Sequence, residues 1–221
     1  MPLTFPSHAA AVLPLKRWRP AWFDGVALVI GSASPDLAYA LDGSGLPVYP
    51  LSHQWPGLVL FCLPVTLLAC VLVRWAAPGV AAHLPGRLTA YGILGCSRPP
   101  LLVTATSAII GAASHLIWDS LAIGPFDLPS TAIGGAVALY FLLRYPPTTD
   151  TPTPHRAARA PVVFWPVAAA VAGAGIALAM RLPAAFLAHT TGARVLIALA
   201  AGMLAGAAVL RGLRGRPSEV A

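Results

Sequence analysis

Long runs of apolar residues alternate with short polar connectors along most of the chain. A helix needs about 20 apolar residues to cross the hydrocarbon core of a bilayer, and about five of the runs approach or reach that length. We therefore predict an all-α integral membrane protein, a polytopic helical bundle with about five full spans. The predicted spans cover residues 58–75, 101–121, 130–145, 162–180 and 193–210.

Two shorter apolar segments precede these spans and are predicted to form an N-terminal helical hairpin. Residues 7–15 can form a helix, which is too short to span because each residue adds only about 1.5 Å. Residues 21–33 form the second helix, and Pro35 is expected to end it, because proline disfavours a helical conformation in the residue before it. A hairpin of these two helices brings His8 and Asp36 back to the same end.

Composition divides the chain into three parts. Residues 1–145 form a predicted membrane domain, in which the Gly- and Pro-rich segment 42–56 is expected to be a loop. Residues 146–161, rich in Pro and Thr, are expected to form a linker. Residues 162–221 carry a pair of Ala- and Gly-rich spans and a basic tail, and small residues allow helices to approach closely in lipid. We interpret this C-terminal pair as scaffold.

The overall composition supports a membrane protein and argues against a nucleic-acid partner. Hydrophobic residues make up 57% of the chain and charged residues 10%, whereas soluble domains carry about a quarter charged residues. The net charge of +7 comes from basic residues at the ends of apolar runs, as the positive-inside rule expects. The expected partner is therefore the lipid bilayer. The cysteines form no C-x-x-C pair and are interpreted as apolar packing residues: Cys62, Cys70 and Cys96.

A histidine and an aspartate in the second predicted span are the strongest chemical signal. His115 and Asp119 are four residues apart and therefore share one face of a helix. Ionisable groups inside or at the edge of lipid are costly to keep, so such a pair indicates function. Asp119 lies near the end of its helix, where the macrodipole disfavours a negative charge, so it needs a partner. A cation bound together with His115, or a simple hydrogen bond from His115, would meet that need.

Three of the six histidines directly follow a serine, which can hold a ligating imidazole by a hydrogen bond. These are His8, His53 and His115, and with Asp36 and Asp119 they form a candidate site that suits zinc, with iron and manganese as alternatives. A metal there would lower the pKa of a bound water to about 7 and polarise an ester or phosphoester oxygen. An aspartate that is not itself a ligand, Asp36 or Asp119, would take the proton. The remaining histidines are interpreted as solvated or interfacial: His83, His155 and His189.

Each candidate ligand lies in a short motif. The motifs are Ser7-His8-Ala9-Ala10-Ala11-Val12-Leu13-Pro14-Leu15, Gly31-Ser32-x-Ser34-Pro35-Asp36-x-x-Tyr39, Ser52-His53-x-x-Pro56-Gly57 and Ser114-His115-x-x-Trp118-Asp119-Ser120. In combination, over about residues 1–145, they resemble those of a bacterial membrane family of unknown function. That family in turn resembles the membrane-bound metal-dependent hydrolases, which share a Pro-Asp, a loop Ser/Thr-His and a His-x-x-x-Asp. The resemblance implies a bacterial inner membrane and a metal at the five candidate residues.

The chain departs from that family at two positions. Leu121-Ala122-Ile123 stand where members often carry a Thr-His pair, and Leu128 or Pro129 stands where members usually carry a further histidine. The chain is therefore expected to bind a single metal, or to be a degenerate member with none. The leading hypothesis is metal-dependent hydrolysis of a membrane-proximal ester or phosphoester, carried by a lipid or another substrate. The alternative is a non-enzymatic membrane scaffold, in which the polar cluster only holds helices together.

Overall fold

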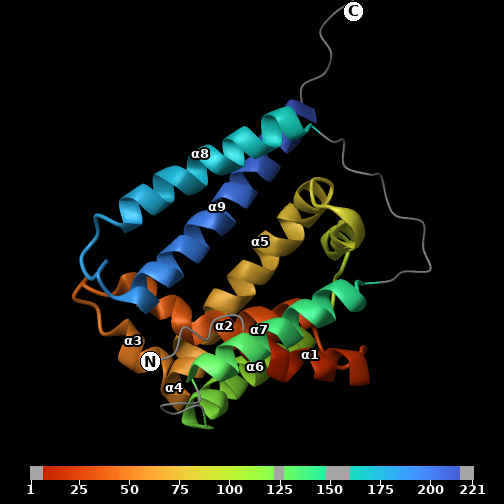
Figure 1. The fold of residues 1–221 in the computed structure, drawn as a ribbon. Helices are drawn as coiled ribbons and strands as arrows, with labels where there is room; N and C mark the ends of the chain where they lie inside the picture. The colour runs from red at the N-terminus through yellow and green to blue at the C-terminus, as the bar shows by residue number, and fades with distance from the viewer. Residues whose placement is uncertain (1–6, 122–126, 148–159, 215–221) are drawn as a thin grey trace, which may run out of the picture. The chain divides into compact units, whose positions relative to one another are not determined.

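The computed structural model describes residues 7–121, 127–147 and 160–214. Within these ranges the chain is helical and contains no strand, which confirms the all-α prediction (Figure 1). The predicted linker, 146–161, lies mostly outside the described residues. The chain divides into two compact units: Met1–Val71, Arg98–Tyr145 and Leu182–Arg194 in the first, and Leu72–Ser97, Pro146–Arg181 and Val195–Ala221 in the second.

The first unit begins with the helical hairpin that the sequence predicts. Helix α1 (His8–Trp18) continues through Pro14 and past the predicted end at residue 15, and α2 (Gly25–Leu37) follows after a short turn. Asp24 caps α2, because its carboxylate accepts hydrogen bonds from two backbone N–H groups of the first turn, at 3.1 and 3.4 Å. A 3₁₀ turn, Ala38–Leu41, extends the helix at its other end.

Pro35 lies inside α2, so the prediction that it ends the helix is wrong. Proline lacks the N–H that would bond the carbonyl four residues earlier, which here belongs to Gly31. The Ser34 hydroxyl donates to that carbonyl at 2.7 Å and replaces the lost hydrogen bond. As a result, α2 carries Asp36 in its last turn.

The segment predicted as a loop, 42–56, is partly helical and leads into the first long helix. Gly57 is required there, because a Cβ at this position would overlap the carbonyl group of Leu51. The long helix also continues past Pro78, where the sequence predicted an end. In chain order, the elements are α3 (Val48–Ser52), α4 (Trp55–Gly57), a π-helical turn (Leu58–Cys62) and α5 (Leu63–Ala81).

Helix α6 (Leu101–Leu121) matches the second predicted span at both ends. Its backbone touches that of α2 at a pair of glycines, Gly31 and Gly111. A Cβ on Gly31 would overlap the carbonyl oxygen of Ala108, and a Cβ on Gly111 would overlap that of Leu28. Small residues allow this close approach. The crossing holds the C-terminal parts of α2 and α6 together, and these parts carry the candidate ligands.

Helix α7 (Asp127–Arg144) packs on α1, and a Cβ on Gly134 would overlap the side chain of Ser7. Among the described residues, four helices are long and apolar enough to cross a membrane, as in a multi-pass membrane protein. Helix α7, the third of the five predicted spans, is not among them. It is less apolar than the four, because it begins with an aspartate and ends with an arginine. The four helices are Trp55–Ala81, Leu101–Leu121, Pro161–Ala179 and Ala188–Leu213.

The second unit contains α8 (Pro161–Ala179), most of α9 (Ala188–Arg214) and the 3₁₀ segment Gly86–Gly95. Phe164 of α8 is fully buried at its centre. His83 stacks on Phe164 with ring centroids 4.3 Å apart, and its Nδ1 lies 2.8 Å from a backbone carbonyl. The prediction of a solvated His83 is therefore wrong, whereas His155 lies outside the described residues.

Candidate metal centre

Five polar side chains meet in the first unit, and they are the five that the sequence singles out. Helix α1 supplies His8, the last turn of α2 supplies Asp36, the residue after α3 is His53, and α6 supplies His115 and Asp119. They form two groups of three whose ligand atoms lie within 4.8 Å of one another: His8, His115 and Asp119, and Asp36, His53 and His115. The structure brings all five together, and their role as metal ligands stays a prediction.

Imidazole Nε2 atoms surround the two carboxylates. His115 Nε2 lies 3.3 Å from Asp119 Oδ2 and 3.4 Å from Asp36 Oδ1. His53 Nε2 is also 3.4 Å from Asp36 Oδ1. His8 Nε2 is 3.6 Å from Asp119 Oδ1 and 3.9 Å from Asp36 Oδ2. Each aspartate is therefore shared between histidines of different elements.

A backbone carbonyl fixes the tautomer of His115. Its Nδ1 lies 2.8 Å from the carbonyl oxygen of Ser32, which can only accept a hydrogen bond. Nδ1 must therefore carry the proton, and in the neutral ring Nε2 presents its lone pair to the two carboxylates. Ser114 donates to the Gly111 carbonyl at 2.7 Å, so it does not hold the ring as the serine–histidine pattern suggested.

A serine does hold the ring of His53. The Ser52 hydroxyl lies 2.9 Å from His53 Nδ1 and within 3.0 Å of two backbone carbonyls, those of Pro35 and Tyr49. Because the hydroxyl donates to a carbonyl, it accepts from Nδ1–H of His53. The Nε2 lone pair of His53 therefore also faces the cluster.

Several atoms of the cluster that could bind a metal are buried without a hydrogen bond. Among the described residues, His53 Nε2, His115 Nε2 and Asp119 Oδ1 have no hydrogen-bond partner, although carboxylate or imidazole atoms lie near them. Buried polar atoms of this kind are rare unless another group binds them. Three imidazoles and two carboxylates are a donor set that can hold a divalent metal ion.

Burial sets the protonation states of the cluster. Burial lowers the pKa of His8 to about 4, and neighbouring His115 adds to the effect. For Asp36, burial alone would raise the pKa, but in the metal-free protein hydrogen bonds donated by the imidazoles of His115 and His53 outweigh it and lower the pKa to about 2. At neutral pH, His8 is thus neutral and Asp36 is ionised, which are the forms that bind metals. Asp119, with 27% of its side chain exposed, is the most open member of the cluster.

Two tyrosines border the cluster, and the sequence analysis did not assign them a role. The ring of Tyr39 stacks on that of Tyr49 at 4.6 Å and lies 5.6 Å from that of His53. Burial raises the pKa of Tyr39, so it stays a neutral phenol. Its spacing from Asp36, one helical turn, was the signal that could have indicated this placement.

The first turns of α9, with the segment before them, belong to the same unit as the cluster. Thr190 donates to Asp42 Oδ2 at 2.5 Å, and His189 Nε2 lies 3.7 Å from the same oxygen. His189 is one-quarter exposed, and its interpretation as a solvated or interfacial histidine stays a prediction. Arg194, only 7% exposed, donates to three backbone carbonyls, and an arginine in an apolar run was the signal for such a role. These carbonyls belong to Ala40, Asp42 and Pro183.

The fold and the site together define a multi-pass helical membrane protein with a buried histidine–aspartate centre that can hold a metal ion. The chain belongs to the DUF4184 family, a domain of unknown function whose profile matches residues 1–122. This match confirms the resemblance to an uncharacterised family, and the matched range includes all five cluster residues. No curated protein and no solved structure matches the chain. The further likeness to membrane-bound metal-dependent hydrolases stays a prediction.

Proposed function

We propose that this protein is a metal-dependent hydrolase that cleaves an ester or phosphoester of a lipid-linked or other membrane-proximal substrate. One observation carries the proposal: the Nε2 atoms of His53 and His115 face carboxylate oxygens at 3.3–3.4 Å while their Nδ1 atoms are held by other acceptors. The proposal also places the protein in a bacterial inner membrane, as the sequence resemblance implies.

These distances suit ligands that share one cation. The lone pairs of a neutral imidazole and a carboxylate repel each other when they face at this range, unless a positive charge lies between them. Ligands bound tetrahedrally to zinc at 2.0–2.2 Å lie about 3.3–3.6 Å from one another. Four of the five His–Asp distances, 3.3, 3.4, 3.4 and 3.6 Å, match that spacing. Zinc is therefore the metal that we expect.

The arrangement favours one ion rather than two. Both groups of three include His115, whose Nδ1 is occupied by Ser32, so His115 offers a single lone pair. One nitrogen lone pair binds one metal. The missing Thr-His pair after Asp119 is consistent with this count, because no further histidine follows in that part of α6.

The chemistry requires a water molecule, a proton acceptor and a path for the leaving group. A bound divalent metal would lower the pKa of water and polarise the ester oxygen. Asp119, the most open carboxylate, would use the oxygen that does not bind the metal to take the proton from the attacking water and return it to the leaving oxygen. A new bond from the water oxygen to carbon or phosphorus replaces the broken ester bond, and the products are an acid and an alcohol. Buried Asp36 would stay a ligand.

The proposal is tested first by metal content. The full chain, purified in detergent without chelators, should contain about one equivalent of a transition metal by mass spectrometry of the metals, or take up zinc to that level. His115→Ala should lower the content to background, whereas the matched control His83→Ala, in the second unit, should leave it unchanged. A wild-type protein that neither contains nor takes up metal would refute the proposal, as would a metal-bound His115→Ala variant.

Activity is the second test. Lipid extracts incubated with the zinc-loaded protein should yield hydrolysis products detectable by mass spectrometry. Asp119→Asn should lower product formation by about a hundredfold or more, the usual loss when a general base is removed. Asn keeps one oxygen that can still contact the cluster, so the variant should retain much of its metal. Equal activity in wild type and Asp119→Asn would exclude Asp119 as the proton acceptor.

A structural role is the second candidate function, and the same contacts support it. If His115 is protonated, it forms an ion pair with Asp36 that ties α6 to α2, and a second one with Asp119 within α6. This alternative predicts a metal-free protein without hydrolytic activity, in which Asp119→Asn lowers the melting temperature. The metal measurement above therefore separates the two functions.

A further inference from the structure

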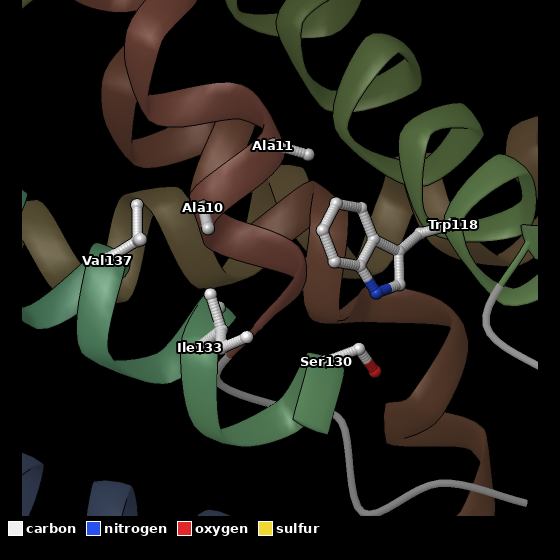
Figure 2. A pocket seen from close by; sticks show the side chains of 7 residues that line it. Ala10, Ala11, Trp118, Ser130, Ile133 and Val137 are labelled. Atoms are coloured by element: carbon white, nitrogen blue, oxygen red, sulfur yellow. The ribbon is translucent and has the colours of Figure 1, made fainter. Parts of the chain in front are cut away.

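A pocket with a cavity volume of about 390 Å³ lies between α1, α6 and α7 of the first unit (Figure 2). This volume falls within the range of about 300–1,000 Å³ that is typical of small-molecule sites. The residues that form it are almost all apolar, which suits a hydrocarbon rather than a polar ligand. They include Ala10, Ala11, Trp118, Ser130, Ile133 and Val137.

We infer that this pocket holds one acyl chain of the substrate, whose ester carbonyl accepts a hydrogen bond from the indole N–H of Trp118. The substrate class is thus an acyl-ester lipid. The inference rests on the proposed function for the cleavage step, whereas the binding of the chain stands on the geometry of the pocket.

The pocket adjoins the candidate metal centre along two helices. Ala11 lies three residues after His8 on α1, and Trp118 lies three residues after His115 on α6, beside Asp119. Residues three apart on a helix are neighbours, with Cβ atoms about 5–6 Å apart. A chain in the pocket would therefore bring the polar end of its lipid to within about one helical turn of the cluster.

Trp118 provides an independent sign of a ligand. Its Nε1 atom is buried and has no hydrogen-bond partner among the described residues. An indole N–H donates only, and a buried donor without an acceptor costs about 1–3 kcal/mol. In Figure 2 the nitrogen lies on the edge of the ring nearer Ser130, at the border of the pocket. The carbonyl oxygen of an ester could accept a hydrogen bond from this N–H.

The surroundings of the pocket identify the occupant as a membrane lipid. One wall belongs to α6, a candidate membrane span, so the bilayer is the adjacent medium. Two other wall residues are open to that medium, since Ile133 is 65% exposed and Val137 is 36% exposed. A lipid chain can therefore enter from the bilayer between α1 and α7 without passing through water.

Photolabelling tests the inference on the full chain. The protein is reconstituted in nanodiscs that contain phosphatidylglycerol with a diazirine at the end of one acyl chain, then irradiated, digested and mapped by mass spectrometry. We expect lipid adducts concentrated on the α1 and α7 segments that line the pocket. Adducts spread evenly over the exposed faces of α5 and α6 would overturn the inference.

A pair of alanine-to-phenylalanine variants tests the pocket itself. Ala10→Phe fills the pocket and should lower its labelling by about tenfold, because a packed interior leaves no room for a chain. Ala136→Phe places the same side chain on an exposed position of α7 that does not line the pocket, and should leave labelling unchanged. Equal labelling of both variants would refute the assignment. Metal content is measured on the same samples, so a protein with zinc but no labelled pocket refutes only this inference.

Trp118→Phe tests the hydrogen bond to the ester. With wild-type protein, the ester-linked probe should label the pocket about fivefold better than its ether-linked analogue, the value of one net hydrogen bond. Trp118→Phe keeps an aromatic ring but removes the N–H, so the two probes should label equally. An ester preference that survives in Trp118→Phe would show that another group binds the carbonyl.

Discussion

Helix α2 buries an aspartate at each of its ends, and the two aspartates have opposite surroundings. Asp24, at the N-terminal end, accepts hydrogen bonds from two backbone N–H groups and from the hydroxyl of Thr104 at 2.8 Å. Its own N–H donates to Ser107 of α6 at 2.9 Å. Asp36, at the C-terminal end, instead faces the Nε2 atoms of two histidines at 3.4 Å. The same pair of helices thus contains one carboxylate bound by backbone N–H and hydroxyl donors and one that faces imidazoles.

The helix dipole widens this difference. A negative charge is stabilised at a helix N-terminus and destabilised at a C-terminus, each by about 0.3–1 kcal/mol. Asp24 occupies the favourable end of α2, whereas Asp36 and Asp119 occupy the C-terminal ends of α2 and α6. The comparison shows that a buried acid indicates a binding site only where its neighbours leave it incomplete. Asp24 is a structural cap, and Asp36 is a proposed ligand of a cation.

The largest expected effect comes from removing the satisfied aspartate. Asp24→Ala deletes the cap of α2 and leaves Thr104 without its acceptor, so we expect the free energy of unfolding to fall by about 3 kcal/mol. Unfolding of the full chain in mixed SDS micelles measures this loss. The folded fraction should still bind zinc, because Asp24 does not touch the cluster. A folded Asp24→Ala protein that does not bind zinc would contradict the purely structural role of Asp24.

Zinc should stabilise the protein through the other end of α2. At a free zinc concentration a hundredfold above Kd, we expect about 2.7 kcal/mol of stabilisation, measured as a rise in melting temperature. Asp36→Asn should abolish the rise, because it removes a carboxylate that the cation needs, and it should destabilise the metal-free protein less than Asp24→Ala does, because Asn has the same size and keeps one side-chain oxygen. A strongly destabilised, metal-free Asp36→Asn variant would show instead that Asp36 is structural, like Asp24.

The helix crossing between the two aspartates can be tested with a methyl group. Gly31→Ala places a Cβ against the Ala108 carbonyl, and overpacking of this kind costs about 2 kcal/mol. Because the helices must move apart, zinc affinity should fall as well. Gly173→Ala in α8 is the control, since a Cβ there meets nothing within 4 Å and replaces a flexible residue. Equal stability of the two variants would argue against backbone contact between α2 and α6.

The sequence predicted the candidate site better than the path of the chain around it. His115 and Asp119 were identified because ionisable residues are rare in apolar runs, the other histidines from their Ser-His pairs, and Asp36 from the predicted hairpin. The ends of α6 followed from the length of its run. The continuation of α2 through Pro35 could not be predicted, because it depends on a hydroxyl that replaces one hydrogen bond. Local sequence patterns do not predict when a side chain will replace a backbone hydrogen bond in this way.

Long-range contacts were missed for a different physical reason. The hydrogen bonds of Arg194 reach carbonyls about 150 residues earlier in the chain, and no spacing rule connects positions so far apart. Tyr49 was missed because its role depends on stacking with Tyr39 across a turn. Apolar periodicity predicts which residues are buried, but it does not predict which distant segments meet.

The smallest expected effect is a pH dependence of the metal-free protein, and it comes from the cluster rather than from the Asp24 end. The pKa of His8 falls from 6.5 in the unfolded chain to about 4 in the folded protein. Between these values the unfolded chain binds more protons, so stability decreases as pH is lowered from 6.5 towards 4. The pKa of Asp36, lowered from 3.8 to about 2, lies below this window and adds nothing to it.

With chelator present, the free energy of unfolding of wild type should fall by about 1 kcal/mol more than that of His8→Gln between pH 7 and pH 5, after allowance for partial solvent screening. Asp24→Ala should keep the wild-type pH profile at a lower overall stability. Parallel profiles for wild type and His8→Gln would mean that His8 is not buried as a neutral ring, and would remove it from the expected ligands.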